Sequence, residues 1–233
     1  MSIYSKLSSL LTAANTKTGE SDATLTDAMQ TLIDGYGSGG GGGTDWDGIA
    51  SGSLPSGKVV LSVQGIEQYV LAYRSCPSWS VYAPNVTYMG QNAFRESTTL
   101  TEAKFPSLNS GHNTGYSLYG CTALTLVDWG SWDLRQNTFV KCSSLKTLIL
   151  RKSTAIQTCA NTSVFDRTPF ANSGSGGTIY IPKALYDHLG DGTSLDYKAA
   201  SNWSVYDGYG TITWAKLEGS PYETYSADGT PIS

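Results

Sequence analysis

The sequence predicts a mainly β repeat solenoid of about four to five coils, preceded by a short N-terminal α-helical hairpin. Two observations support this class. A motif recurs every 21 to 24 residues between residues 73 and 150, and two helical patterns precede a run of glycines. The composition agrees, because only 15% of the residues are charged, against roughly 25% in an average soluble domain. Such a profile is typical of β-rich proteins of extracellular or virion surfaces.

The N-terminal region carries two amphipathic helical patterns, over residues 2–14 and 25–36. Helices of about 12 residues are marginal alone in water, so their apolar faces need a partner. We expect the hairpin to dock into a larger assembly or to pack on other copies of the chain. An ordinary hairpin packed on the main domain is the alternative. The assembly residues would be Ile3, Leu7, Leu10, Leu11, Leu25, Met29, Leu32 and Ile33.

A Gly-rich segment separates this hairpin from the rest of the chain. Residues 38–43 read SGGGGG, which has the composition of a flexible linker. The predicted organisation is a helical hairpin over residues 1–37, a linker over 38–45, a repeat domain with a C-terminal cap over 46–218, and a tail over 219–233.

The repeat aligns on small residues at Cys76, Ser97, Cys121 and Cys142, at intervals of 21, 24 and 21 residues. Apolar residues recur three positions before each anchor and three, six and eight positions after it. The last two share one face of a strand, because alternate side chains point the same way. Residues 151–177 would be an inserted loop, and an earlier strand is predicted near Val59. The expected core contains Phe94, Leu100, Phe105, Leu124, Val127, Phe139, Leu145, Leu148 and Leu150.

Residues 89–100 read MGQNAFRESTTL, which resembles the I-G-x-x-A-F-x-x-C-x-x-L signature of BspA-like leucine-rich repeats. Residues 119–124 (YGCTAL) and 139–146 (FVKCSSLK) are similar to its second half. Residues 179–186 and 197–203 resemble the terminal strand, short helix and A-x-N-W segment of that family. Trp79 and Pro84 depart from the pattern. The resemblance implies a leucine-rich-repeat solenoid over roughly residues 66–218.

The N-terminal hairpin and its linker resemble tail-associated proteins of siphophages and prophages of gut bacteria. The resemblance implies a virion component, a phage tail or tail-tip protein, that docks through its N-terminus and presents the repeat domain to a host surface. The first residues lack the basic and apolar regions of a signal peptide, which fits release within a particle. The expected partners are other virion proteins, a host-surface glycan or protein, and further copies in a homo-oligomer. A bacterial surface leucine-rich-repeat adhesin is the alternative.

Charged residues on the predicted strands indicate a binding face. Glu102, Lys104, Asp128, Lys146 and Arg151 lie between inward-facing positions, so we expect them on the outer strand face, where solenoids bind partners. A merely solvated surface is the alternative. Aromatic residues in turns suit sugar binding, because they join an apolar body to a polar tip. An aromatic platform would use Trp132, with Tyr116 and Tyr119. Packing of these rings in the core or between chains is the alternative.

Catalysis is not expected from this sequence. The only histidines are His112 and His188, and no cysteine pair has C-x-x-C spacing, so we expect no metal and no cofactor. Asp128 and Asp133 form the nearest approach to a glycosidase carboxylate pair, which leaves a glycan-degrading enzyme as a minor alternative. A net charge of −4 argues against a nucleic-acid partner, and no segment is apolar enough to insert in a membrane.

The cysteines are interpreted as small buried anchors rather than as reactive groups. Cys121 and Cys142 would lie on neighbouring coils within disulfide range, but free thiols are the favoured reading. Cys159 falls in the expected insertion, where it could be exposed.

Overall fold

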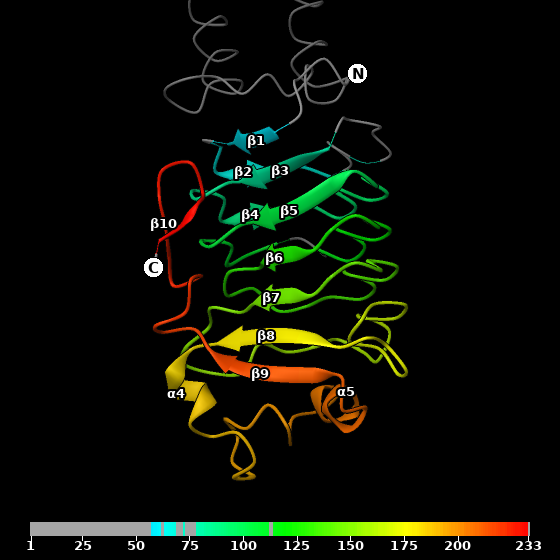
Figure 1. Ribbon diagram of the computed structural model, residues 1–233, viewed down its shortest axis with the longest axis vertical. Helices are drawn as coiled ribbons and strands as arrows, with labels where there is room; N and C mark the ends of the chain where they lie inside the picture. Colours follow the sequence, from blue (N-terminus) through cyan, green and yellow to red (C-terminus); the bar gives the residue numbers. More distant parts are fainter. Residues whose placement is uncertain (1–56, 62, 69–71, 73–77, 112–113, 233) are drawn as a thin grey trace, which may run out of the picture. The chain divides into compact units, whose positions relative to one another are not determined.

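The computed structural model describes residues 57–61, 63–68, 72, 78–111 and 114–232, all of which belong to the unit Trp46–Ser233. Their main element is a seven-stranded parallel sheet in which the strands follow chain order (Figure 1). Because every strand pairs in parallel with the next, each connection crosses to the opposite side of the domain before the chain re-enters the sheet. The strands are β1 (Gly57–Val60), β3 (Trp79–Tyr82), β5 (Leu100–Lys104), β6 (Leu126–Asp128), β7 (Thr147–Ile149), β8 (Gly177–Ile181) and β9 (Ile212–Lys216).

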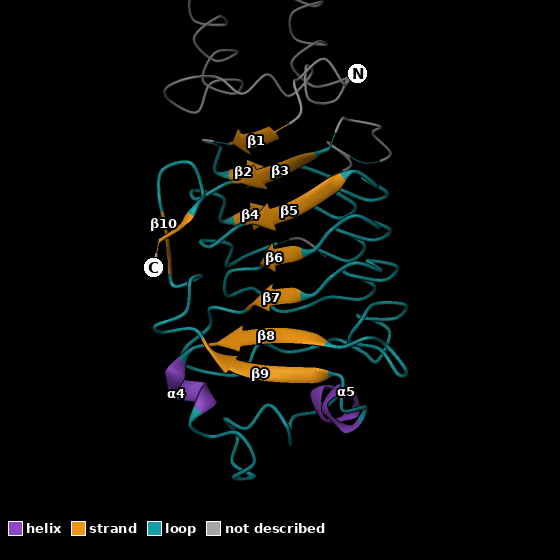
Figure 2. Ribbon diagram, viewed as in Figure 1, coloured by secondary structure: helices purple, strands orange, loops and turns teal. Residues whose placement is uncertain are grey.

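Shorter elements complete the described domain (Figure 2). A second, two-stranded parallel ladder joins β2 (Gly65–Ile66) to β4 (Tyr88–Met89). Helices α4 (Lys183–Tyr186) and α5 (Trp203–Gly208) lie close to the β9 end of the sheet. An antiparallel hairpin, β10 (Thr224–Tyr225) with β11 (Pro231–Ile232), ends the chain.

The strand register places equivalent positions of successive repeats next to one another. Val81, Ala103, Val127, Leu148 and Ile179 are partners along the row from β3 to β8, and all five are buried. Alternate residues of each strand therefore point away from this row, toward what we call the outer face of the sheet.

The turns that return the chain also repeat. Glu96, Gly120, Lys141 and Arg167 all have a positive φ, between 57° and 74°. The amide of Glu96 donates to Tyr119, that of Gly120 to Val140, and that of Lys141 to Asp166, so each turn bonds to the next. These left-handed positions let one turn geometry recur in successive repeats without a glycine in each.

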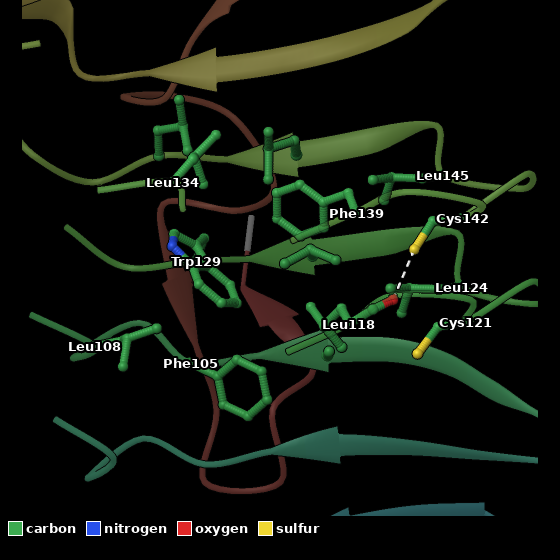
Figure 3. Packing of buried hydrophobic residues seen from close by; sticks show 14 of the residues in the cluster. Phe105, Leu108, Leu118, Cys121, Leu124, Trp129, Leu134, Phe139, Cys142 and Leu145 are labelled. Atoms are coloured by element: carbon green, nitrogen blue, oxygen red, sulfur yellow. Dashed lines mark hydrogen bonds between the residues drawn. The ribbon is translucent and has the colours of Figure 1, made fainter. Parts of the chain in front are cut away.

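The expected core is confirmed. All nine residues predicted to be inward are fully buried in one contiguous cluster, part of which Figure 3 shows. Phe139 links the aromatic part of this cluster, with its ring 5.5 Å from Trp129 on one side and 5.5 Å from Phe165 on the other. Buried aromatic pairs of this kind add to the stability that area burial supplies.

The expected fold class is wrong as stated. Four to five coils with a helical hairpin were expected, whereas the described residues form a seven-stranded parallel sheet, and their only helices are the short α4 and α5. The sequence repeat reached only β3, β5, β6 and β7, because β1, β8 and β9 join the sheet by backbone pairing without the anchor pattern. The hairpin expected over residues 1–37 and the linker over 38–45 lie outside the described residues.

The segment expected to be an inserted loop contributes to the interior instead. Val164, Phe165 and Phe170 are fully buried in the main core cluster. Phe165 also contacts the cap residues Trp203 and Tyr206, with ring centroids at 5.7 and 5.0 Å. Residues 151–177 therefore continue the hydrophobic core from β7 to Trp203 and Tyr206, although they contain almost no β-strand.

After β9 the chain turns back along the sheet, and we call residues 219–232 the C-terminal strap. In Figure 1 it runs as the red segment from the β9 end toward β1. Just before it, Leu217 packs against Leu126 and Ile149 on the outer face, in a small cluster separate from the main core. The strap therefore covers part of the face on which a binding surface was expected.

Candidate functional site

Loops that follow three parallel strands border one open depression of about 440 Å³. Its lining comes from the loops after β5, β6 and β7, which meet at one edge because parallel strands all end on the same side. The lining side chains are chemically mixed, with one indole, one carboxylate, two cations, hydroxyls and an amide. They are Asn109, Ser131, Trp132, Asp133, Arg151, Lys152, Ser153 and Thr154.

Trp132 is the aromatic residue of this depression. It is half-buried, and the guanidinium of Arg135 lies 5.3 Å from the ring centroid. Gly111 lets the indole approach closely, since a Cβ there would lie 3.2 Å from Nε1 of Trp132 and 2.9 Å from the carbonyl oxygen of Met89. The ring is thus held by its surroundings, as a pre-formed binding platform needs to be.

Asp133 and Lys152 form a polar pair at the same edge. Nζ of Lys152 lies 3.2 Å from Oδ1 of Asp133, which also accepts the backbone N–H of Thr158 at 2.9 Å. Both side chains stay partly exposed, at 30% for Lys152 and 23% for Asp133. A part-exposed pair offers donors and an acceptor to a polar ligand.

The buried residue Gln157 hydrogen-bonds to two of the residues that line the depression. Its Nε2 donates to the carbonyl of Trp132 at 2.7 Å, and its Oε1 accepts the amide of Lys152 at 3.2 Å. Its own carbonyl accepts the indole N–H of Trp203 at 2.8 Å. Gln157 therefore connects Trp132 and Lys152, which line the depression, to Trp203. Sequence reasoning missed it, because nothing in its local pattern marks it as buried.

Three of the expected binding residues are engaged within the chain. Asp128 is fully buried and Lys104 is 5% exposed, so the expectation that they lie on an open face is corrected. Arg151 lies over Asp128, with its Nε 2.8 Å from Oδ2, and it also borders the depression. The physical reason is the C-terminal strap. Gly229 accepts a hydrogen bond from Lys104 at 3.0 Å, and Tyr225 donates one to Asp128 at 2.8 Å.

The remaining expected charges lie nearer to solvent. Glu102 is partly exposed and forms an ion pair of 2.7 Å with Lys104. Lys146 is exposed and donates to Oγ of Ser175 at 2.7 Å and to the carbonyl of Gly176 at 3.2 Å. The expected assembly residues of the hairpin lie outside the described residues.

Tyr116 and Tyr119 form an aromatic cluster of their own, with ring centroids 5.7 Å apart. The guanidinium of Arg95 lies 4.9 Å from the ring of Tyr119, and Nζ of Lys141 lies 5.0 Å from it. Two cations therefore lie near the ring of Tyr119, whereas the ring of Trp132 has Arg135 beside it and also borders the depression. Within the described part of the chain neither tyrosine ring pairs with that of Trp132, and of the three only Trp132 lines the depression, so the expected three-residue platform reduces to Trp132.

The three cysteine thiols that the structure describes are buried and free. No disulfide joins Cys121, Cys142 or Cys159, and each thiol donates to a nearby carbonyl; that of Cys142 donates to Leu118 at 3.0 Å (Figure 3). Burial raises the pKa of Cys142 and of Cys159 to about 12. Cys159 is buried rather than exposed, because residues 151–177 pack into the core. Cys76 and His112 lie outside the described residues.

The two candidate catalytic carboxylates each have a cation of their own, Arg151 for Asp128 and Lys152 for Asp133. Within the described ranges no three His, Cys, Asp or Glu residues gather as a metal site would require. No helix in that same part of the chain is long and apolar enough to cross a membrane. Comparisons with protein families, with curated proteins and with solved structures found no match for this chain.

The strap is the main feature that sequence reasoning passed over. Tyr222 and Tyr225 supply its contacts to the outer face, yet they were assigned to a tail. One signal was available: Asp228-Gly229 is a hairpin turn dipeptide, and it lies between two short β-forming stretches.

Proposed function

We propose that this chain is a non-catalytic adhesive component of a virion that binds a host-surface glycan in the depression around Trp132. In this proposal residues 1–37 dock into a phage tail or tail tip, and the sheet domain faces the host. The observation that carries the binding proposal is the combination of one held indole with hydroxyl, amide and charged groups in a single open depression.

The chemistry of that depression suits a sugar. A pyranose offers a C–H face that packs on an aromatic ring and hydroxyls that need both donors and acceptors. Trp132 supplies the ring, Lys152 and Asn109 supply donors, and Asp133 supplies an acceptor. An open site binds weakly alone, but linked copies raise overall affinity by about 100-fold or more without new contacts.

The virion assignment rests on the sequence. The helical patterns, the Gly-rich linker and the resemblance to phage tail proteins support it, and the resemblance to BspA-like repeats stays a prediction. A bacterial surface adhesin would use the same depression. The ion pairs of Asp128 and Asp133 weigh against glycan hydrolysis, because each carboxylate is already engaged by a cation within the chain.

A glycan array probed with the full-length protein tests the binding site. Trp132→Ala should lower binding to the recognised glycans by about 30-fold or more, as expected for a central aromatic contact. Tyr186→Ala is the matched control, because Tyr186 is an exposed aromatic on α4 and its loss should change nothing. Unchanged binding by Trp132→Ala, or no binding by the wild type, would refute the site, and release of new reducing ends would refute the non-catalytic role.

The virion assignment has its own test. Particles purified from the source by density-gradient centrifugation should contain peptides of this chain when analysed by mass spectrometry. Recovery of the chain only from the bacterial surface fraction would favour the adhesin instead.

A further inference from the structure

The C-terminal strap is held on the outer face by side chains that recognise its backbone. Arg151 donates from one guanidinium nitrogen to the carbonyl of Tyr222 at 2.7 Å and from another to that of Glu223 at 3.1 Å. Nζ of Lys104 donates to the carbonyl of Gly229 at 3.0 Å. Charged donors that bind main-chain carbonyls in this way capture an extended segment and not one particular side chain.

Tyr225 is the side-chain anchor of the strap. Its hydroxyl donates to Oδ2 of the buried Asp128 at 2.8 Å, and its ring lies 5.6 Å from that of Tyr82. Two cations lie near the ring, with Nζ of Lys104 at 5.6 Å and the guanidinium of Arg151 at 5.4 Å from its centroid. The outer face thus offers a tyrosine socket, in which a carboxylate accepts the hydroxyl and two cations lie near the ring.

The turn at Asp228-Gly229, near the end of the strap, also contacts the sheet. Asp228 and Thr230 accept hydrogen bonds from Lys58 of β1, at 3.3 and 2.6 Å. Gly229 is buried against Tyr82, where an added Cβ would lie 2.4 Å from the ring. The face therefore selects a tyrosine followed, three residues later, by an Asp-Gly turn.

Besides these contacts, the ring of Tyr222 lies 5.0 Å from that of Tyr180 and packs against the small outer-face cluster around Leu217. The residues of the strap are partly or fully exposed except Gly229, and its own hairpin pairs only two residues in each strand. Segments with few buried apolar contacts open locally at lower free energy than the core. The socket, by contrast, stands on β5 and β6, whose neighbouring inward residues are fully buried.

We propose that the outer face of β3, β5, β6 and β7 is a peptide-binding surface, with the strap as its occupant within the chain. A protein segment that carries a tyrosine three residues before Asp-Gly can replace the strap when the strap opens. The surface is separate from the indole of the depression, so the proposal stands whether or not the depression binds glycan. The strap regulates access to it.

The test uses the full chain with a protease site inserted between Gly219 and Ser220, in an exposed turn. After cleavage, the strap should dissociate on dilution, and a fluorescent synthetic peptide of residues 220–233 should bind the vacated face. A peptide with Tyr225→Phe should bind about tenfold or more weakly, because it leaves the buried Asp128 without one donor. A peptide with Ala227→Ser is the matched control, since Ala227 is exposed. Equal binding of the Tyr225→Phe peptide, or a folded cleaved protein that binds no peptide, would overturn the proposal.

If cleavage unfolds the domain, hydrogen exchange on the uncut protein tests whether the strap opens and whether the peptide replaces it. Strap amides should exchange faster than those of β6 and β7, and excess peptide of residues 220–233 should speed their exchange further. Strap exchange as slow as that of the core, with no effect of the peptide, would show that the strap never leaves and would overturn the proposal.

Discussion

Arg151 covers the buried carboxylate of Asp128, with a guanidinium nitrogen 2.7 Å from Oδ2. The same carboxylate accepts the hydroxyl of Tyr225 at 2.8 Å and the backbone N–H of Gly130 at 3.2 Å. One carboxylate therefore joins β6, the loop after β7, the strap and the turn that leads to Trp132. Burial raises the pKa of Tyr225 and the charge of Asp128 raises it further, so the hydroxyl remains a donor at neutral pH.

Asp128→Ala should destabilise the domain by about 3 kcal/mol or more, because it leaves the guanidinium of Arg151 without its carboxylate. Urea unfolding at neutral pH measures the effect. Lys146→Ala, on an exposed side chain, should change the free energy of unfolding by less than about 0.5 kcal/mol. Replacing both partners, by Asp128→Ala with Arg151→Met, should recover part of the loss. Equal stability of Asp128→Ala and the control would contradict the importance of this pair.

Leu148→Ala should lower the free energy of unfolding by about 2–5 kcal/mol, since Leu148 is fully buried in the stacked row. The exposed Val205 on α5 supplies the control substitution Val205→Ala, which should have little effect. Thermal and urea denaturation of both variants check the expectation. A Leu148→Ala protein as stable as wild type would be incompatible with the strand register described above.

Gly130→Ala should be far more damaging than Gly192→Ala. Both glycines have a positive φ, 60° and 73°, so the backbone strain of an alanine is similar at about 1–2 kcal/mol. At Gly130, however, a Cβ would also lie 2.4 Å from the carbonyl oxygen of Leu108, whereas nothing lies within 4 Å at Gly192. The difference between the two unfolding free energies measures the clash. Similar losses in both variants would mean that the loop of Leu108 can move aside.

Stability should fall at alkaline pH partly through Cys142. Burial raises the pKa of its thiol from 9.0 to about 12, so above pH 9 the unfolded chain binds fewer protons than the folded chain. The free energy of unfolding contributed by this group is therefore fully present below pH 9 and falls by up to about 1.4 kcal/mol per pH unit above it, until the folded thiol ionises.

Cys142→Ser isolates this effect, because a serine hydroxyl does not ionise in that range. Urea unfolding at pH 7.5, 9, 10 and 11 should show a shallower alkaline loss for the variant than for wild type. Leu145→Val, which removes buried apolar volume without a titrating group, should lower stability equally at every pH. Parallel curves for Cys142→Ser and wild type would show that the thiol does not contribute.

The inward positions of the central repeats could be predicted from the sequence alone. Leu145 and Leu148 belong to a spacing that recurs, and local periodicity decides which side of a strand an apolar residue occupies. The extent of the sheet could not be predicted in this way. β8 was expected only through the resemblance of residues 179–186 to a terminal strand and short helix, and both β8 and β9 join by main-chain hydrogen bonds, which place no demand on the anchor residues.

The candidate sites also contain features that local sequence determines and features that only the tertiary structure decides. The sequence determined by itself that Trp132 lies next to a turn, at Gly130-Ser131, and that Asp128 and Arg151 alternate with inward residues, because these are properties of neighbouring positions. Only the tertiary structure decided that residues 219–232 return over the outer face and bury Asp128. That contact joins residues 97 positions apart, and no short-range pattern encodes which distant segment will satisfy a buried carboxylate.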